Sequence, residues 1–255
     1  MFLACDLGNT FAKFCVYEGD KTVRLWKSKY EDYDSEAFSQ FPITGAGISS
    51  VVTEFTQIVA SDIRNKFDID PFIIDHNARF NIKINYLTPR TLGIDRICSV
   101  EGAFSIFRSD PEFLNYNEKT FLVTVDLGTA TTINIVKYNA EFSGGIITPG
   151  LTTMVKSLFT NTARLPEIDL KNDYKGFWGV DTHSSIASGI INSAVSIIEK
   201  SLMQLKNIDG AEKIKLFITG GNSEVILNYL PMEFVFVNDL VLRGVKAIYE
   251  RNFVD

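Results

Sequence analysis

The chain has 255 residues, a formal net charge of −6 and 45% hydrophobic residues. This length fits one large or two medium domains, and the apolar fraction is ample for a buried core. The negative charge argues against a nucleic-acid binder, because such proteins neutralise phosphates with Lys and Arg. The three cysteines have neither metal-ligand nor disulfide-framework spacing, which favours a reduced, cytoplasmic setting. We expect no secretory signal and no membrane span, since no long apolar run is present.

The first predicted element is a hairpin. An apolar run, Phe2 to Cys5, leads into Asp6-Leu7-Gly8-Asn9-Thr10, and a second strand pattern covers residues 11–17. A third strand is expected over residues 22–28. Lys13 follows the turn, and from the sequence alone a solvated strand lysine is favoured over a phosphate ligand.

The next elements alternate between helices and strands. The pattern predicts a short helix within residues 31–41, a small-residue strand over 45–52 and a helix over 53–66, followed by a short buried strand at 72–75. His76 is expected to be a loop residue, because no second His or Cys lies near it in the sequence.

Residues 82–97 form a polar loop that leads into a helix. Pro89 and Gly93 interrupt the loop, and Asp95-Arg96 open the helix, whose apolar face recurs from Ile97 to Phe107. The positive end of the helix dipole would keep Asp95 ionised. From spacing alone, we slightly favour a capping role for Asp95 with Arg96 as its ion-pair partner.

A second hairpin follows a polar linker at residues 110–119. The apolar run that starts at Phe121 ends in Asp126-Leu127-Gly128-Thr129, and alternating residues resume at Thr132. A carboxylate that ends a buried strand is costly unless it meets a cation or hydrogen-bond donors, so Asp126 is predicted to face a bound metal or its water. Two such turns indicate two related halves that bind a phosphate-and-metal ligand such as a nucleotide. The alternative is two ordinary hairpins, which accounts for each copy but poorly for the pair.

The remaining elements are again strands and helices. We expect a strand with paired glycines over residues 141–148, a helix over 151–159 after Pro149-Gly150, and a long helix to about residue 206 with Thr182 as its N-cap. A strand at 215–218 ends in Gly220-Gly221 and is predicted to enter another helix, a weak signal for a nucleotide site. A strand at 233–237 precedes a last helix capped by Asn238.

Taken together, these motifs resemble the type III pantothenate kinases, which belong to the superfamily of acetate and sugar kinases, Hsp70 and actin. The resemblance runs nearly end to end. Its motifs are Asp6–Thr10, Tyr86–Pro89, Gly93–Arg96, Asp126–Thr132, Gly144–Gly150, Thr162–Pro166, Gly179–Thr182 and Thr219–Gly221. The Gly-x-Asp-Arg segment and the Gly-Gly to Pro-Gly segment are more specific to this kinase type than the Asp-x-Gly turns. Lys156 departs from the family, in which His is frequent at this position.

The resemblance implies ATP-dependent phosphorylation of pantothenate to 4'-phosphopantothenate, the first step of coenzyme A biosynthesis. It implies that Asp95 is the catalytic base, which overturns the capping preference. The residues implied for ATP or phosphate binding are Asp6, Leu7, Gly8, Asn9, Thr10, Phe11, Ala12, Lys13 and Thr129. The residues implied for pantothenate are Tyr86, Gly93, Ile94, Asp95, Arg96 and Thr182. Asp126 would bind a monovalent cation (K⁺ or NH₄⁺), and Asp6 would hold Mg²⁺, directly or through water.

The predicted fold is therefore α/β, with two similar actin- or ribonuclease-H-like halves, mixed sheets, flanking helices and an ATP cleft between the halves. We place the N-terminal half at residues 1–117, with the phosphate hairpin, substrate loop and catalytic Asp. The C-terminal half covers residues 118–255, with the second hairpin and a nucleotide-binding Gly-Gly turn. A homodimer is expected, with neither nucleic acid nor membrane as a partner. The alternative function is a nucleotide-binding regulator of the same fold without kinase turnover.

Overall fold

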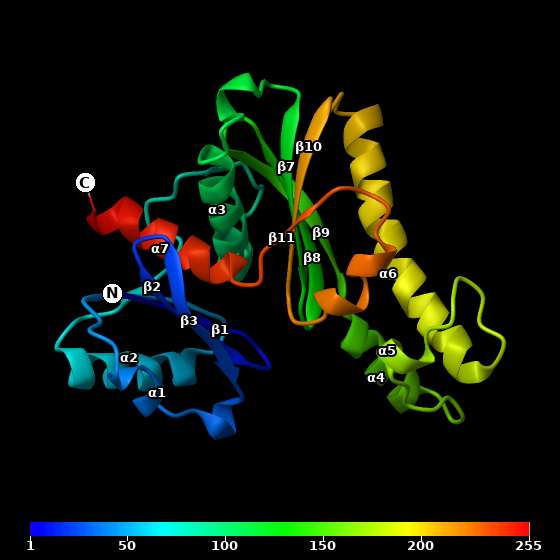
Figure 1. Ribbon diagram of the computed structural model, residues 1–255, viewed down its shortest axis with the longest axis horizontal. Helices are drawn as coiled ribbons and strands as arrows, with labels where there is room; N and C mark the ends of the chain where they lie inside the picture. Colours follow the sequence, from blue (N-terminus) through cyan, green and yellow to red (C-terminus); the bar gives the residue numbers. More distant parts are fainter. Residues whose placement is uncertain (255) are drawn as a thin grey trace. The chain divides into compact units, whose positions relative to one another are not determined.

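The computed structural model describes residues 1–254, which divide into two compact units (Figure 1). The first unit comprises residues 1–115, residues 139–143 and the described residues from 239 onward. The second unit comprises residues 116–138 and 144–238. Each unit contains a mixed sheet with helices against it, so the predicted α/β class is confirmed. The division into two halves after residue 117 stays a prediction. In the structure, the C-terminal helix belongs to the first compact unit.

The sheet of the first unit has the strand order β3-β2-β1-β4-β5. Its central strand β1 pairs antiparallel with β2 and parallel with β4, which makes the sheet mixed. The strands are β1 (Phe2–Leu7), β2 (Ala12–Glu18), β3 (Lys21–Ser28), β4 (Gly45–Ser50) and β5 (Phe72–Ile73). The apolar runs noted in the sequence form the buried centre of this sheet, because β1, β2 and β4 are covered on both faces.

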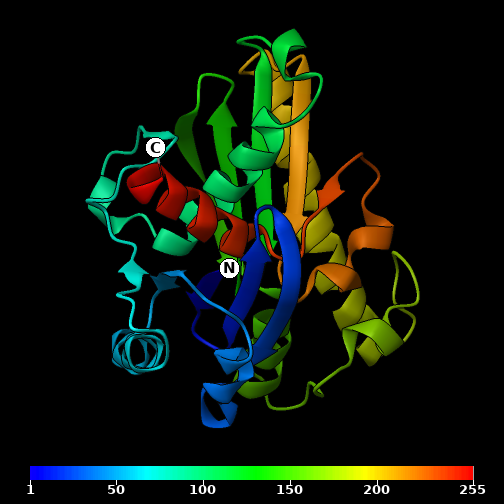
Figure 2. The ribbon, with the colours of Figure 1, turned by 60° about the vertical axis from the view of Figure 1, so that its left-hand side comes forward.

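Helices cover both faces of this sheet (Figures 1 and 2). On one face, Val59 and Ile63 of α2 (Thr53–Phe67) share a core with Leu3 of β1. On the other face, Val245 of α7 (Leu240–Phe253) lies against β4, where a Cβ at Gly47 would come within 2.8 Å of it. The unit also contains the short helix α1 (Glu36–Ser39), helix α3 (Ile94–Arg108), and single 3₁₀ turns at Tyr30–Asp32, Pro89–Thr91 and Phe113–Asn115.

Helices α3 and α7 cross at two glycines. A Cβ on Gly102 of α3 would lie 2.1 Å from the carbonyl oxygen of Leu240, and one on Gly244 of α7 would lie 1.7 Å from that of Cys98. Neither position has room for a side chain, so the two backbones pack directly on each other. This crossing joins the last helix to the helix that begins at Ile94.

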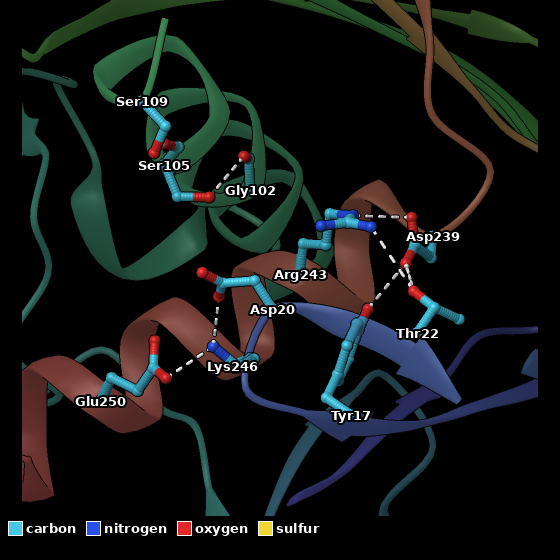
Figure 3. Close-up of polar contacts among 10 residues, drawn as sticks. All are labelled: Tyr17, Asp20, Thr22, Gly102, Ser105, Ser109, Asp239, Arg243, Lys246 and Glu250. Carbon is cyan, nitrogen blue, oxygen red and sulfur yellow. Dashed lines mark hydrogen bonds and ion pairs between the residues drawn. The ribbon is translucent and has the colours of Figure 1, made fainter. Parts of the chain in front are cut away.

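A polar cluster holds the start of α7 against the hairpin β2–β3 (Figure 3). The Asp239 carboxylate accepts hydrogen bonds from the hydroxyls of Tyr17 (3.0 Å) and Thr22 (2.9 Å) and pairs with Arg243 at 2.9 Å. One turn further on, Lys246 pairs with Asp20. Asn238 was predicted as the cap of this helix, and that prediction is wrong. The helix begins at Leu240, so Asp239 occupies the cap position, and its carboxylate serves the cluster rather than a helix amide.

The second unit contains a sheet whose strand order is β11-β10-β7-β8-β9. Strands β7 and β8 form the predicted second hairpin, and β10 pairs parallel with β7. The strands are β7 (Thr120–Leu127), β8 (Ala130–Lys137), β9 (Glu141–Pro149), β10 (Lys213–Thr219) and β11 (Val235–Phe236). The first residues of β9 belong to the first unit, where Glu141 and Phe142 pair with β6 (Lys83–Ile84).

Helices α4 (Leu151–Asn161), α5 (Leu170–Asp173) and α6 (Thr182–Asn207) build the core of the second unit with its sheet. Two predictions were wrong here. Thr182 is the first residue of α6, and the N-cap is Asp181, which exchanges hydrogen bonds with Ser184 in a capping box. Two 3₁₀ turns, Ser223–Val225 and Leu227–Tyr229, replace the helix predicted after Gly221, because the proline after Leu230 disfavours a helical conformation there.

Candidate active site

The first hairpin places a carboxylate and an amine directly opposite each other. Asp6 on β1 is paired in register with Lys13 on β2, and the Lys13 Nζ lies 3.9 Å from the Asp6 Oδ2. Residues 8–11 form the turn between Leu7 and Ala12, and the Gly8 amide donates to the Phe11 carbonyl at 3.1 Å. Asn9 and Thr10 are exposed at its tip. The turn thus presents polar groups to solvent above the buried Asp6 and the half-buried Lys13.

Tyr30, which the sequence did not single out, supports this turn from a distant part of the chain. Its hydroxyl donates to the Gly8 carbonyl, and the Val51 amide donates to the Leu7 carbonyl at 3.1 Å. Burial, and secondly the Asp6 carboxylate, raise the pKa of the Tyr30 hydroxyl, so it stays protonated and able to donate. No local pattern reveals this contact, because 22 residues separate its partners.

The predicted catalytic segment opens α3. Asp95 lies half-buried in the first turn, and the cap residue is Gly93, with no side-chain capping hydrogen bond. The capping role that spacing alone favoured is therefore wrong. A Cβ on Gly93 would lie 2.3 Å from Asp95 Oδ1. The Asp95 carboxylate thus folds back over Gly93. It occupies space that is free only because Gly93 has no side chain.

Two predicted pantothenate residues meet on Phe142, a fully buried residue of the first unit that the sequence analysis did not identify. The Tyr86 ring packs edge-on against Phe142 with ring centroids 5.9 Å apart, and the buried Arg96 guanidinium lies 5.7 Å above the same ring. The pairing of β6 with the start of β9 brings them together, since the Asn85 amide donates to the Phe142 carbonyl at 3.2 Å. At the other end of this loop, His76 Nε2 donates to the Leu92 carbonyl at 2.8 Å.

The second hairpin has a neutral residue where the first has a lysine. Asp126 is half-buried, and Thr132 is its register partner on β8. Other backbone and side-chain groups of the same unit fix the three turn carbonyls. Asn222 donates to the carbonyls of Leu127 (2.9 Å) and Gly128 (3.1 Å), while Gly150 and Thr153 donate to that of Thr129 at 2.9 and 2.6 Å. The exposed side chain of Thr129 lies on this fixed turn.

The Gly-Gly turn after β10 packs on this second hairpin. Gly220 has a φ of +104°, and a Cβ there would lie 2.4 Å from the Leu127 amide and 2.6 Å from Asp126 Oδ1. Only glycine fits both the conformation and the space. The predicted nucleotide-binding turn therefore also shapes the surroundings of Asp126.

The predicted site residues fall into separate groups. The first unit holds Asp6 to Lys13, Tyr86 and Gly93 to Arg96, while the second holds Asp126, Thr129 and Thr182. Thr182 is exposed at the start of α6. Within residues 1–254, His, Cys, Asp and Glu side chains form no cluster of three suited to a metal ion. Among the same residues, no helix is both long and apolar enough to cross a bilayer.

Comparison with known proteins gives a consistent family match. The family model described as "Type III pantothenate kinase" matches residues 2–204. A type III pantothenate kinase of Persephonella marina is 31% identical over 98% of this chain and 98% of its own length. Another, from a Sulfurihydrogenibium species, is 28% identical over 96% of this chain and 98% of its own.

Solved structures agree on the fold. A protein of Campylobacter jejuni described as a putative Baf family transcriptional activator superposes with a TM-score of 0.63 at 22% identity, covering 98% of both chains. The archaeal actin homolog Ta0583 superposes with a TM-score of 0.50 at 11% identity, covering 98% of this chain and 99% of its own. At these identities the likeness establishes an actin-like α/β fold.

Proposed function

Since the chain belongs to the type III pantothenate kinase family, which uses ATP to phosphorylate pantothenate in coenzyme A biosynthesis, we propose which of its residues perform that reaction. The observation that carries the proposal is the start of α3, where Asp95 folds over Gly93 and Arg96 packs on Phe142. At this helix start, a carboxylate that can accept a proton is next in the chain to a guanidinium that packs on Phe142.

Asp95 is the base in this proposal. Its carboxylate lies in the first helical turn, where the positive end of the helix dipole attracts negative charge. Phosphoryl transfer proceeds through a loose transition state, so a carboxylate of modest basicity suffices to accept the hydroxyl proton of pantothenate late in the reaction. Gly93 contributes by leaving the space in which the carboxylate lies.

Arg96, Tyr86, Ile94 and Thr182 bind pantothenate in this proposal, together with Gly93. Arg96 suits the carboxylate of pantothenate, because its planar guanidinium donates several hydrogen bonds and always carries its charge. The Phe142 ring holds Arg96 and Tyr86 at fixed positions within the first unit. Thr182 is the exposed first residue of α6 in the second unit.

Each hairpin contributes to nucleotide binding in a different way. In the first, Gly8 to Lys13 would contact phosphate oxygens through the exposed turn and the Lys13 ammonium. In the second, Thr129 would offer its hydroxyl from a turn whose carbonyls are all held. Rigid donors of this kind stabilise transferring phosphoryl charge without reorganisation during the reaction.

The carboxylates Asp6 and Asp126 fit two different cations. Asp6 suits Mg²⁺, because this ion is usually held by one or two carboxylates, waters and substrate phosphates. Asp126 has Thr132 as its register partner and lies beside Gly220, and its carboxylate is the oxygen ligand that would hold K⁺ or NH₄⁺. When bound, these cations would supply charge neutralisation for the phosphates.

A coupled ADP-release assay with ATP, Mg²⁺ and pantothenate tests the proposal. We expect turnover that requires pantothenate and is higher in potassium than in sodium, and a loss of kcat of at least about 100-fold in Asp95→Asn. Asp110→Asn, an alteration outside the site, is the matched control and should keep wild-type kcat. Turnover that survives Asp95→Asn undiminished would remove the base assignment and keep the kinase.

The competing function is a nucleotide-binding regulator, and the description of the Campylobacter jejuni neighbour as a putative transcriptional activator is what favours it. A regulator has no need of the proton acceptor at the start of α3. ATP binding without any pantothenate-dependent turnover, measured calorimetrically on the same preparation, would favour the regulator.

A homodimer is also part of the proposal. Three large apolar side chains just before α6 face solvent in the single chain: Phe177 is 63% exposed, Trp178 82% and Val180 91%. Adjacent exposed apolar residues of this kind are typical of protein interfaces. A second copy of the chain covering them would also lie close to Thr182. Trp178→Ser should shift the sedimentation coefficient from dimer to monomer, and an unchanged dimer would place the interface elsewhere.

A further inference from the structure

Glu101 is a fully buried carboxylate on α3 that the proposed mechanism does not use. Its Oε1 accepts the amides of Asn81 (2.6 Å) and Ile82 (2.9 Å), and its Oε2 accepts the Asn81 side-chain amide at 2.8 Å. Three donors from two consecutive residues therefore converge on one side chain. Nothing in the local sequence around Glu101 indicates this, since about 20 residues separate the partners.

The residues that Glu101 holds begin the substrate segment. Asn81 and Ile82 come directly before β6, which pairs with Glu141 and Phe142, and Tyr86 follows two residues after β6. A shift at residue 82 would therefore move Tyr86 along or away from the Phe142 ring. The far end of the same segment is held by the His76–Leu92 hydrogen bond, next to Gly93.

Helix α3 connects this anchor to the proposed base. Glu101 lies six residues after Asp95 on one continuous helix, about 9 Å along its axis. The helix carries the proposed base at its start, and through Glu101 it accepts hydrogen bonds from Asn81 and Ile82 at the start of the substrate segment. Within the first unit, its own backbone thus sets the distance between Asp95 and the strand that precedes Tyr86.

We propose that Glu101 is a positioning residue for pantothenate: it fixes the segment from Asn81 to Tyr86 against the helix that bears Asp95 and Arg96. This inference rests on the site assignment of the proposed function. An anchor made of one carboxylate and two backbone amides fixes direction as well as distance, which apolar packing alone would not do.

The energetic cost of the arrangement supports a positioning role. Burial raises the pKa of the Glu101 carboxyl, and the hydrogen bonds from Asn81 and Ile82 act against that rise, as does the charge of Arg251. An apolar side chain would fill the same space without this cost of burying a charged group. The carboxylate instead supplies acceptors for backbone amides that would otherwise be buried without partners.

Two substitutions test the inference in the full-length protein. Glu101→Leu removes every acceptor, and we expect the KM for pantothenate to rise at least about 10-fold, with the KM for ATP changed by less than about 2-fold. Glu101→Gln keeps one carbonyl oxygen for the two backbone amides and should restore most of the pantothenate KM. Hydrogen exchange of the peptide spanning residues 80–86 should accelerate in Glu101→Leu and return towards wild type in Glu101→Gln.

Phe107→Leu is the matched control for a general loss of helix packing. It alters the same helix, at a ring that packs on Phe104 and Phe113, and should lower thermal stability without raising the pantothenate KM. An unchanged pantothenate KM in both Glu101 variants would overturn the inference, even if exchange accelerates. If Glu101→Leu does not fold, Asn81→Ala decides, because it removes the side-chain donor to Glu101 Oε2, and an unchanged pantothenate KM in that variant would overturn the inference. Absence of pantothenate-dependent turnover in the wild type would instead be a failure of the proposed function.

Discussion

The two Asp-x-Gly hairpins have the same sequence pattern and different local chemistry. In the first, four residues separate the last register pair, and Asp6 is opposite Lys13. In the second, three residues separate the last pair, and Asp126 is opposite Thr132. The first carboxylate therefore has a lysine of its own hairpin at 3.9 Å, and the second has a neutral threonine as its register partner and lies beside Gly220.

The supports of the two turns differ as well. A tyrosine hydroxyl and one amide hold the carbonyls of the first turn, whereas Asn222, Gly150 and Thr153 hold all three carbonyls of the second. Side-chain and backbone donors hold both turns, with two such hydrogen bonds at the first and four at the second. The same motif thus has a lysine opposite its carboxylate in the first hairpin and a threonine opposite it in the second, and more hydrogen bonds hold the second turn.

Replacing each aspartate with asparagine is expected to give the largest difference in kinase rate between the two hairpins. Asp6→Asn is expected to lower kcat/KM by about 10³-fold in any monovalent salt, because the loss affects charge placed at the phosphates. Asp126→Asn should lower the rate in potassium to the rate in sodium and change the sodium rate little. Both are measured by ADP release across a potassium titration at constant ionic strength. Asp209→Asn, an exposed surface change, is the control, and an equal potassium response in both hairpin variants would contradict the assignment.

Stability should distinguish the second turn, on which Gly220 packs, from the first. Gly220→Ala forces a Cβ to within 2.4 Å of the Leu127 amide at a φ of +104°, and we expect it to lower the free energy of unfolding by about 2–4 kcal/mol. Gly8→Ala meets only the Phe11 carbonyl at 3.4 Å and should cost less than about 1 kcal/mol. Urea unfolding measures both. Gly221→Ala, where a Cβ meets nothing within 4 Å, controls for alanine in the same loop. Similar losses for Gly220→Ala and Gly221→Ala would show that backbone packing does not support the second turn.

The sequence predicted these hairpins because each is local. An apolar strand, a glycine turn and a second strand lie within about 15 residues, and the start of α3 follows from the Gly-x-Asp-Arg segment. Helix caps were misplaced by one residue at Asp181 and Asp239, because in each case the adjacent side chain was an equally good capping type.

What the sequence could not predict depends on contacts between distant residues. Tyr30 reaches Gly8, Glu101 reaches Asn81, and Phe142 lies beneath Arg96 only because a strand crosses there. The difference between the hairpins also depended on register. One more or one fewer residue in a turn decides whether Lys13 or its neighbour is opposite the carboxylate, and no composition argument fixes that number.

The support of the exposed turn by Tyr30 gives the smallest expected effect. Tyr30→Phe removes only the hydroxyl that donates to the Gly8 carbonyl, so we expect a loss of about 1 kcal/mol in the free energy of unfolding and a KM for ATP that rises a few-fold. Tyr33→Phe is a matched control, because its ring also packs on Phe55 while its hydroxyl donates to Asp62 instead. It should cost similar stability and leave the KM for ATP unchanged. If both variants raise that KM equally, ring packing supports the turn, and the hydroxyl would then have no specific part in the difference between the two hairpins.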